Sequence, residues 1–200
     1  MKYDLLYVDP PWQYGNTSTK GAAENHYETM SVKELCAYRE APDAAAEDSA
    51  LCMWVTYPTL PDAFTVASAW GFEYVTFLFT WIKTYPNGKV VTSGLGNYTR
   101  SNPESILLFR KGKGLKRIDT PDARRTQQVQ FFRRLGHSAK PLEFYGLLDQ
   151  IFGVGTSKIE FFSRGVWLDG WTHLGNEAAK SPSGLLDIHQ KTRVKKVKRE

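Results

Sequence analysis

Two adjacent prolines directly after a short apolar run constrain the start of this chain more than any other feature of its sequence. The run is residues 5–8, and Asp9, Pro10, Pro11 and Trp12 follow it. A proline cannot donate a backbone hydrogen bond to a neighbouring strand, so two prolines end any strand that reaches them. The sequence therefore predicts a buried strand at 5–8 that ends in a stiff loop.

Further apolar runs predict strands at 50–55, 74–83, 105–109, 159–162 and 171–174. Helix signals separate the strands. A capping box starts a short helix at Ser31, Pro61 and Gly71 lie near the two ends of a helix at 59–70, and another helix covers 141–152. On that last helix one face carries four apolar side chains: Leu142, Tyr145, Leu148 and Phe152. Strands that alternate with helices favour an α/β fold with a mostly parallel, three-layer sheet, which binds ligands at the carboxyl ends of its strands.

The segments between these elements read as loops. We expect a polar loop at 17–24, a linker at 41–49, a turn at 86–88, a glycine-rich loop up to 102 and a basic loop at 111–125. The domain is expected to cover residues 1–180. Residues 181–200 are expected to form a basic, disordered tail.

Composition excludes several classes of protein. The 200 residues, 42% of them apolar, suit one globular domain. No apolar run approaches the roughly 18 residues of a membrane span, and a secretory signal is missing from the first residues, so a cytoplasmic protein without membrane contact is expected. Cys36 and Cys52 form no C-x-x-C pair and the 4 histidines are scattered, so we expect neither a disulfide framework nor a metal site.

Positive charge gathers in two parts of the chain. The net charge is +5, and residues 189–200 carry 6 basic and 1 acidic side chains. Residues 110–140 carry 10 basic and 2 acidic side chains. Each segment has two readings: a solvated surface, or a contact with nucleic-acid phosphates.

The loop at 9–12 combines groups that suit one chemical task. An exocyclic amine of a nucleobase is planar and a poor nucleophile, because its lone pair is delocalised into the ring. Two acceptors at its two hydrogens favour a pyramidal, attacking geometry. The Asp9 carboxylate and the Pro10 carbonyl are candidate acceptors, and the Trp12 ring is a candidate stacking surface. Because Pro11 has no N–H, we expect no neighbouring amide to compete for the Pro10 carbonyl. The alternative is a turn that ends a strand and packs a tryptophan.

Six segments in order, spread over residues 3–177, resemble the amino-methyltransferases that contain the eukaryotic messenger-RNA adenosine methyltransferase and its bacterial and phage DNA-adenine relatives. The six are Asp-Pro-Pro-Trp at 9–12, Tyr-Glu-Thr-Met-Ser at 27–31, Trp-Ile-Lys at 81–83, Lys-Pro at 140–141, Lys-Ile-Glu-Phe-Phe-Ser-Arg at 158–164 and Trp-Thr-His-Leu-Gly-Asn at 171–176. The resemblance implies a single Rossmann-like methyltransferase domain with a mostly parallel mixed sheet, helices on both faces and a permuted motif order. It departs from the family at Ser163, where a glycine or alanine is usual, and it lacks a glycine-rich nucleotide fingerprint.

The resemblance also implies residue roles. The catalytic group would be Asp9, Pro10, Pro11 and Trp12. The substrate base would contact Tyr27, Trp81, Lys83 and Glu104, although Trp81 closes an apolar run and could equally be core. S-adenosyl-L-methionine would be held by Asp9, Lys140, Arg164, Asn176 and Glu177, without a metal. We expect Lys113, Lys116 and Arg117 to lie near the Asp9 pocket and to hold the nucleic-acid backbone.

The expected activity is methyl transfer to the 6-amino group of adenine in DNA, with DNA as partner. Three alternatives stay open at the level of the sequence: adenosine in RNA, the 4-amino group of cytosine in DNA, and a catalytically silent relative that binds nucleic acid. The presence of Asp9 and both prolines argues against the silent relative.

Overall fold

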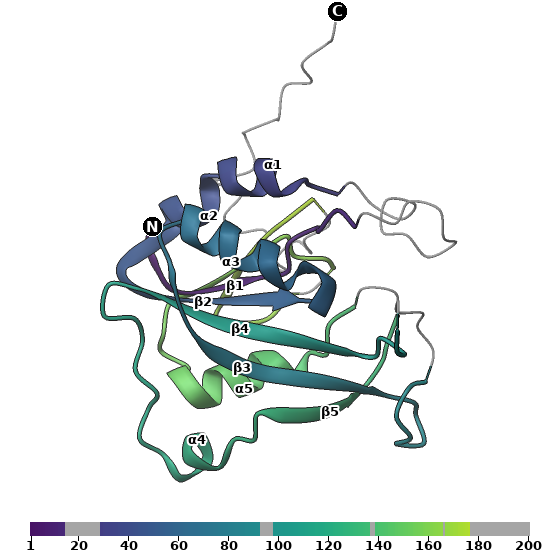
Figure 1. Ribbon diagram of the computed structural model, residues 1–200. Helices are drawn as coiled ribbons and strands as arrows, with labels where there is room; N and C mark the ends of the chain where they lie inside the picture. Colours follow the sequence, from purple (N-terminus) through teal and green to yellow (C-terminus); the bar gives the residue numbers. More distant parts are fainter. Residues whose placement is uncertain (15–28, 93–97, 137–138, 166, 177–200) are drawn as a thin grey trace, which may run out of the picture.

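The computed structural model describes residues 1–14, 29–92, 98–136, 139–165 and 167–176. Seven strands form one sheet in the order β5-β3-β4-β2-β1-β6-β7 (Figure 1). The strands are β1 (Tyr3–Val8), β2 (Ala45–Val55), β3 (Glu73–Thr84), β4 (Pro103–Lys111), β5 (Val129–Arg133), β6 (Lys158–Phe161) and β7 (Trp171–Leu174). Neighbours are parallel except where β4 pairs with β2 and β3, so β4 runs against the other strands.

Helices cover both faces of the sheet. They are α1 (Val32–Ala37), α2 (Glu40–Ala44), α3 (Leu60–Ala69), α4 (Pro121–Arg125) and α5 (Glu143–Phe152), with a short 3₁₀ turn at Tyr57–Thr59. α1, α2 and α3 lie over one face and α5 lies over the other (Figure 1). No helix in the described ranges is long and apolar enough to cross a membrane. The architecture is therefore a single α/β domain of the Rossmann-like type, as the sequence predicts.

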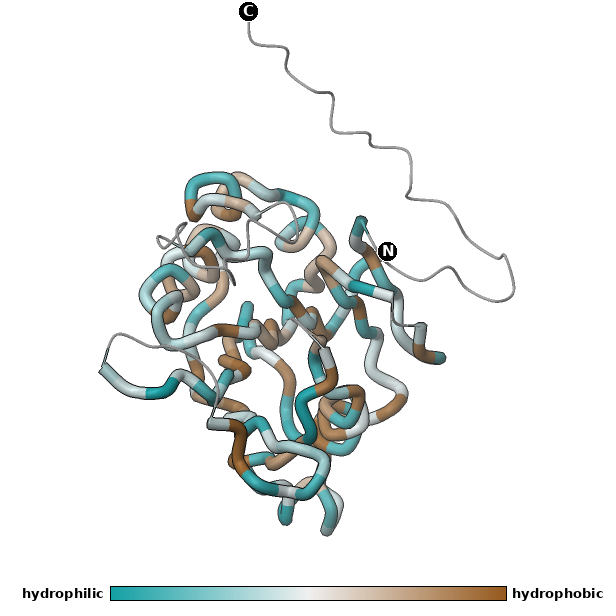
Figure 2. The backbone as a smooth tube through the Cα atoms, turned by 90° about the vertical axis from the view of Figure 1, so that its right-hand side faces the viewer, coloured by the Kyte–Doolittle hydropathy of each residue, from teal (hydrophilic) through white to brown (hydrophobic). Residues whose placement is uncertain are grey.

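Burial on both faces follows from the two-residue repeat of a strand. In β1, Leu6 and Val8 belong to the core under α1 and α3, while Leu5 and Tyr7 belong to the core under α5. All four side chains are buried, which explains why the run is apolar without alternation. Figure 2 shows hydrophobic segments running through the middle of the molecule.

Several sequence predictions are confirmed. Ser31 caps α1, and its capping box with Glu34 is complete. Pro61 lies in the first turn of α3, and Gly71, just beyond that helix, takes a positive φ of 80°. The turn after β3 forms at the predicted place, where Gly88 N–H donates to the Tyr85 carbonyl at 2.9 Å. The expected loop at 17–24 and the tail at 181–200 lie outside the described residues.

Other predictions are wrong. The expected linker at 41–49 is part of α2 and β2 instead, because Ala41 and Ala45 are small enough to pack into the core under α1. The expected loop at 111–125 ends in the short helix α4, whose first turn is capped by Thr120. Leu142 precedes α5 and is 48% exposed, so it does not share the buried face of that helix. The edge strand β5 is also missing from the sequence prediction.

Candidate active site

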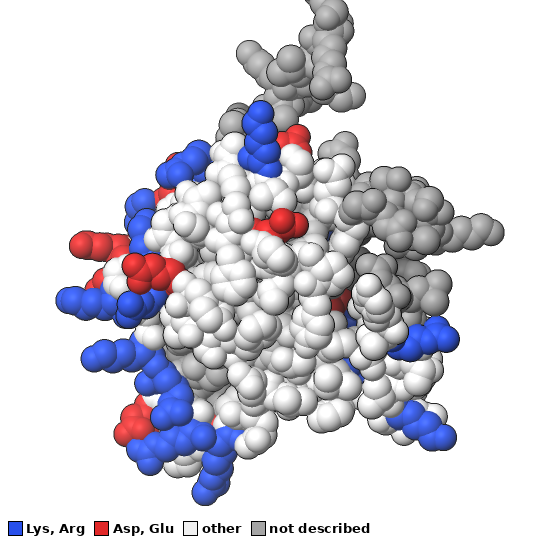
Figure 3. Space-filling model, in the orientation of Figure 1, with Lys and Arg blue, Asp and Glu red and all other residues white. Residues whose placement is uncertain are grey.

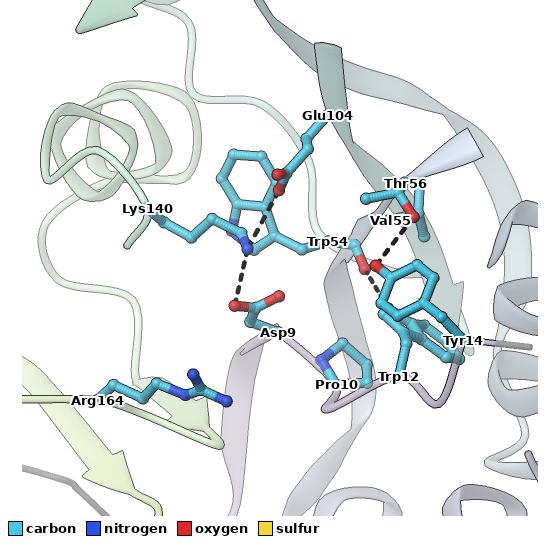
Figure 4. Close-up of a pocket in the computed structure, with 10 residues that line it drawn as sticks. All are labelled: Asp9, Pro10, Trp12, Tyr14, Trp54, Val55, Thr56, Glu104, Lys140 and Arg164. Carbon is cyan, nitrogen blue, oxygen red and sulfur yellow. Dashed lines mark hydrogen bonds and ion pairs between the residues drawn. The ribbon is translucent and has the colours of Figure 1, made fainter. Parts of the chain in front are cut away.

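A pocket opens at the carboxyl end of β1, where the loop at 9–12 begins. β1 lies between β2 and β6, so the residues that follow these three parallel strands meet at one end of the sheet. We call this end of the strands the pocket edge, and the end where these strands begin the opposite or far edge. β4 runs the other way and therefore begins at this edge, where it contributes Glu104. The pocket is lined by Asp9, Pro10, Trp12, Tyr14, Trp54, Val55, Thr56, Glu104, Lys140 and Arg164 (Figure 4).

Charges of alternating sign connect the pocket residues. Lys140 Nζ lies 2.9 Å from Asp9 Oδ2 and 3.2 Å from Glu104 Oε2. The other oxygen of Glu104, Oε1, accepts a hydrogen bond from Lys83 Nζ at 2.5 Å. The four side chains thus form a line of carboxylate, ammonium, carboxylate and ammonium, in which each inner charge has two partners of opposite sign.

Aromatic rings support the two ammonium groups. Lys140 Nζ lies 5.2 Å from the ring centroid of Trp54, and Lys83 Nζ lies 5.1 Å from that of Trp81. The two indoles also contact each other edge to face, with centroids 6.1 Å apart. A cation over an indole face is stabilised electrostatically, so these tryptophans help to fix both lysines.

The network shifts the pKa values of its members in different directions. Burial raises the pKa of the Asp9 carboxyl, and the nearby Lys140 ammonium offsets part of that rise. Burial also acts to raise the pKa of Glu104, but Lys140 and Lys83 outweigh it and lower that pKa to about 2. Lys140 loses hydration by burial, yet Asp9 and Glu104 together raise its pKa. Glu104 is therefore firmly ionised, whereas Asp9 is the carboxylate that protonates first as the pH falls.

The loop at 9–12 folds back on itself. Trp12 N–H donates to the Pro10 carbonyl at 2.8 Å, across Pro11. The expectation that no neighbouring amide competes for this carbonyl is therefore wrong, because the tight turn brings in the amide two residues later. One lone pair of the carbonyl oxygen remains for another donor. The Pro11 carbonyl accepts from Met30 N–H at 2.8 Å, which ties the loop to the segment before α1.

Trp12 belongs to both the pocket wall and the core. Its side chain is only 4% exposed, and its indole N–H donates to the Trp54 carbonyl at 3.1 Å. Tyr14 lies beside it, and its hydroxyl shares a hydrogen bond of 3.0 Å with the Thr56 hydroxyl. Burial raises the pKa of Tyr14 to about 12, so this phenol stays neutral and offers a hydrogen bond.

The remaining candidates from the sequence lie at different distances from the pocket. Trp81 is buried, donates its indole N–H to the Phe132 carbonyl at 2.9 Å, and lies behind Trp54 rather than in the pocket wall. Lys83 reaches the pocket through Glu104. Arg164 lines the pocket after β6, and Asn176 follows β7, the next strand in the sheet. Tyr27 and Glu177 lie outside the described residues.

Gly175 makes a close approach that no other residue type permits. A Cβ atom at this position would lie 2.4 Å from the Ser163 carbonyl oxygen and 2.5 Å from the Ser163 nitrogen. Ser163 N–H donates to the Leu174 carbonyl at 3.0 Å, which holds the two backbones together. Phe162, just before Ser163, takes a positive φ of 62°. This contact fixes Arg164 and Asn176 relative to each other.

The first part of the basic segment, which contains Lys113, Lys116 and Arg117, lies at the opposite edge of the sheet, whereas Arg133 and Lys140 lie at the pocket edge. β4 begins beside Val55 at the pocket edge and ends with Lys111 beside Ser49, about 20 Å away at 3.3 Å per residue. Ile118 N–H donates to the Ile151 carbonyl near the far end of α5, whereas Lys140 precedes its near end. The expected proximity of Lys113, Lys116 and Arg117 to Asp9 is therefore wrong, because the antiparallel β4 carries the chain away from the site. In Figure 3 many Lys and Arg side chains gather along the left edge, where β4 ends.

Sequence reasoning also missed four pocket residues: Tyr14, Trp54, Val55 and Thr56. Trp54 and Val55 end β2, which pairs with β1 in parallel with Val8 opposite Met53, and Thr56 follows directly. Their position at the carboxyl end of a buried strand was the available signal. Among the described residues no group of three or more His, Cys, Asp and Glu side chains is arranged to hold a metal ion.

Two comparisons with known proteins agree with this geometry. The MT-A70 family model matches residues 3–177. The chain is also 34% identical, over 197 aligned residues, to the Type II methyltransferase M.MunI of Mycoplasma sp, and the alignment covers 88% of this chain and 78% of that protein. The residues matched by the family model include the pocket and the strands that form it. The chain therefore belongs to the MT-A70 family of nucleic-acid methyltransferases.

Proposed function

We propose that this protein transfers a methyl group from S-adenosyl-L-methionine to the 6-amino group of adenine in DNA. The observation that carries the proposal is that Asp9 and Pro10, which offer a carboxylate and a carbonyl as acceptors, line one pocket together with Trp12 and Tyr14. Similarity to a Type II methyltransferase supports DNA as the substrate. The motifs shared with adenine methyltransferases support adenine as the base.

The two acceptors act on the amine. Lys140 pairs with Oδ2 of Asp9, so Oδ1 is the oxygen assigned to the amine. Oδ1 and the remaining lone pair of the Pro10 carbonyl would each accept one amine hydrogen, which concentrates the nitrogen lone pair on the side facing away from them. Methyl transfer to this nitrogen would leave the amine with one proton more than the product carries, and that proton would pass to solvent or to Asp9. This role requires an ionised Asp9, which Lys140 favours.

The cofactor side of the pocket follows from the sheet order. Bound S-adenosyl-L-methionine supplies the methyl group from a sulfonium centre. Arg164 and Asn176 follow β6 and β7, to one side of β1, and their side chains suit a carboxylate and hydroxyl groups. Arg164 lines the pocket and carries a guanidinium, which suits a carboxylate, so we assign it to the cofactor carboxylate. Glu104 and Lys83 lie on the other side of β1, which leaves that side for the base.

Incubation with labelled S-adenosyl-L-methionine and matched DNA and RNA, followed by nucleoside mass spectrometry, tests the proposal. We expect N6-methyladenine in the DNA sample. The Asp9→Ala variant should lose methyl transfer by 100-fold or more, on the order expected for a lost transition-state acceptor, while its cofactor affinity by calorimetry stays within about tenfold. Label in RNA alone, or in cytosine, would overturn the assignment of the substrate. Unchanged turnover of Asp9→Ala would overturn the role of Asp9.

A further inference from the structure

A second group of cations lies at the same edge of the sheet as the pocket. We call Lys89, Arg100 and Arg133 the basic rim. Arg133 ends β5 opposite Thr84, the last residue of β3. Lys89 lies in the turn that follows β3, where its carbonyl accepts from Tyr85 N–H at 2.8 Å. Arg100 comes shortly before Pro103, where β4 begins at this edge, opposite Ile82.

The rim is close enough to the pocket for one nucleic-acid strand to reach both. In sheet order β4 and β2 separate β3 from β1, so β3 lies about 14 Å and β5 about 19 Å to the side of β1, at about 4.8 Å per strand. The strand registers place Asp9 level with Phe79, and Thr84 and Arg133 lie a further 5 residues along the strands, so they are about 22 and 25 Å from Asp9. The line of ionic contacts from Asp9 through Lys140 and Glu104 to Lys83 joins the two places. A strand advances about 3.4 Å per nucleotide in a duplex, so this span covers about seven nucleotides beside the target base.

Fewer carboxylates surround the rim than surround the basic segment at the opposite edge. Within residues 83–92, 98–104 and 129–136, Glu104 is the only carboxylate, and it is paired with two lysines. Lys89, Arg100 and Arg133 are exposed and form no ion pair within the described ranges. At the far edge, in contrast, Arg110 pairs with Glu73 and Arg124 pairs with Asp119, and Asp48 accepts from Lys113 N–H.

Exposed aromatic side chains accompany these cations. Tyr85 is 40% exposed and Tyr98 is fully exposed, although large aromatic rings are usually buried. Rings of this kind stack on unpaired bases, and cations beside them hold the phosphates. In Figure 3 a smaller group of Lys and Arg side chains lies at the right, where β3 and β5 end in Figure 1, and no Asp or Glu side chain projects among them.

We infer that the basic rim binds the phosphate backbone of the DNA strand that carries the target adenine. This inference rests on the proposed function. Arg164 and Asn176 occupy the β6 and β7 side of Asp9, so the strand approaches from the β3 and β5 side. A base that leaves the stack costs a few kcal/mol, and phosphate contacts beside it keep the strand in position during that step. The larger basic segment at the far edge takes no part in this contact.

Two variants with equal charge change test the inference. The first is Lys89→Gln/Arg100→Gln/Arg133→Gln, and the matched control is Lys113→Gln/Lys116→Gln/Arg117→Gln at the opposite edge. All six side chains are exposed, so both variants should keep the parent's thermal midpoint and cofactor affinity. The measurement is the affinity for a mixed-sequence DNA duplex as a function of salt concentration, together with methyl transfer to the same DNA.

Each phosphate contact contributes about 0.9 to the slope of log Kd against log salt concentration. The rim variant should lose about 2 to 3 from that slope and require more DNA for half-maximal methylation, whereas the control variant should match the parent. An unchanged slope in the rim variant, or equal losses in both variants, overturns the inference while the parent still methylates DNA. A parent protein that neither binds nor methylates DNA overturns the proposed function itself.

Discussion

The ammonium of Lys140 lies 2.9 Å from the Asp9 carboxylate, so the group assigned to the substrate amine is already held by a partner of opposite charge. Lys140 comes from the segment before α5 and Asp9 follows β1, so the contact joins two distant parts of the chain. It keeps one carboxylate oxygen in a fixed position and favours the ionised form of Asp9.

Removal of that ammonium should alter how activity depends on pH. Lys140 lowers the pKa of Asp9, so Lys140→Gln should raise it further, and activity should be lost at a higher pH as the solution becomes more acidic. An opposite charge at this distance is worth roughly 1 to 3 pKa units, and the acid limb of kcat/KM should move by about that amount. Lys113→Gln removes the same charge at the far edge and should leave the limb in place. A Lys140→Gln profile that matches the parent's would show that Lys140 does not act through Asp9.

Glu104 should stabilise the fold in a defined pH range. Its pKa falls from an ordinary 4.5 to about 2 in the folded protein, so its contribution is complete above 4.5 and disappears as the pH falls toward 2. That shift corresponds to about 3 kcal/mol of unfolding free energy. Urea denaturation from pH 5 to pH 2 should therefore show a weaker pH dependence for Glu104→Gln than for the parent. Parallel curves would mean that Lys83 and Lys140 do not hold Glu104 ionised.

Substitution of Trp12 should lower the free energy of unfolding. Its side chain is 4% exposed, so Trp12→Ala should cost about 3 to 5 kcal/mol of unfolding free energy. Trp12→Phe keeps an aromatic ring but loses the hydrogen bond to the Trp54 carbonyl, and it should fold with a smaller loss. Methyl transfer by the folded Trp12→Phe protein then measures what the indole adds to base binding. A Trp12→Ala protein as stable as the parent would contradict the core position.

Gly175 should tolerate no side chain. Gly175→Ala brings a Cβ atom within 2.5 Å of two Ser163 backbone atoms, so we expect at least 1 to 3 kcal/mol of destabilisation from overpacking. Cofactor affinity should fall with it, because Arg164 and Asn176 flank the contact. Gly146 supplies a control within α5, where an added Cβ meets nothing within 4 Å. Gly146→Ala should stabilise the protein by about 0.5 to 1 kcal/mol, and thermal denaturation of the two variants would show opposite signs.

Local sequence signals predicted those elements whose stability is decided nearby. The capping box at Ser31 and the prolines after Val8 each act within a few residues, and both were read correctly. The segment at 41–49 was predicted wrongly because packing decides its structure: Ala45 lies in β2 and in the core under α1, although alanine by itself favours a helix. β5 was missed for a similar reason, since it is a short edge strand with exposed Val129 and Phe131 and depends on pairing with β3.

The site was harder to predict than the fold because its contacts cross the sheet. The motifs identified Asp9, Glu104 and Lys140 one by one, but the ion pairs that join them depend on strand order. The position of the basic segment depends on the direction of β4, which no local pattern of apolar residues encodes. The expected position of Lys113, Lys116 and Arg117 near the pocket was therefore at the wrong edge of the sheet.

The antiparallel direction of β4 also restricts how the length of this chain can change. Glu104 lies within β4, paired with Trp81 on β3, and Ile106 is paired with Trp54 on β2. One residue inserted between Glu104 and Ile106 would turn the carboxylate to the opposite face of the sheet and separate it from Lys140. Insertions in the exposed stretch around Lys116 would change no pairing at the pocket. Among relatives that keep this activity, insertions and deletions should therefore occur in the segment after β4 but not among the first residues of β4.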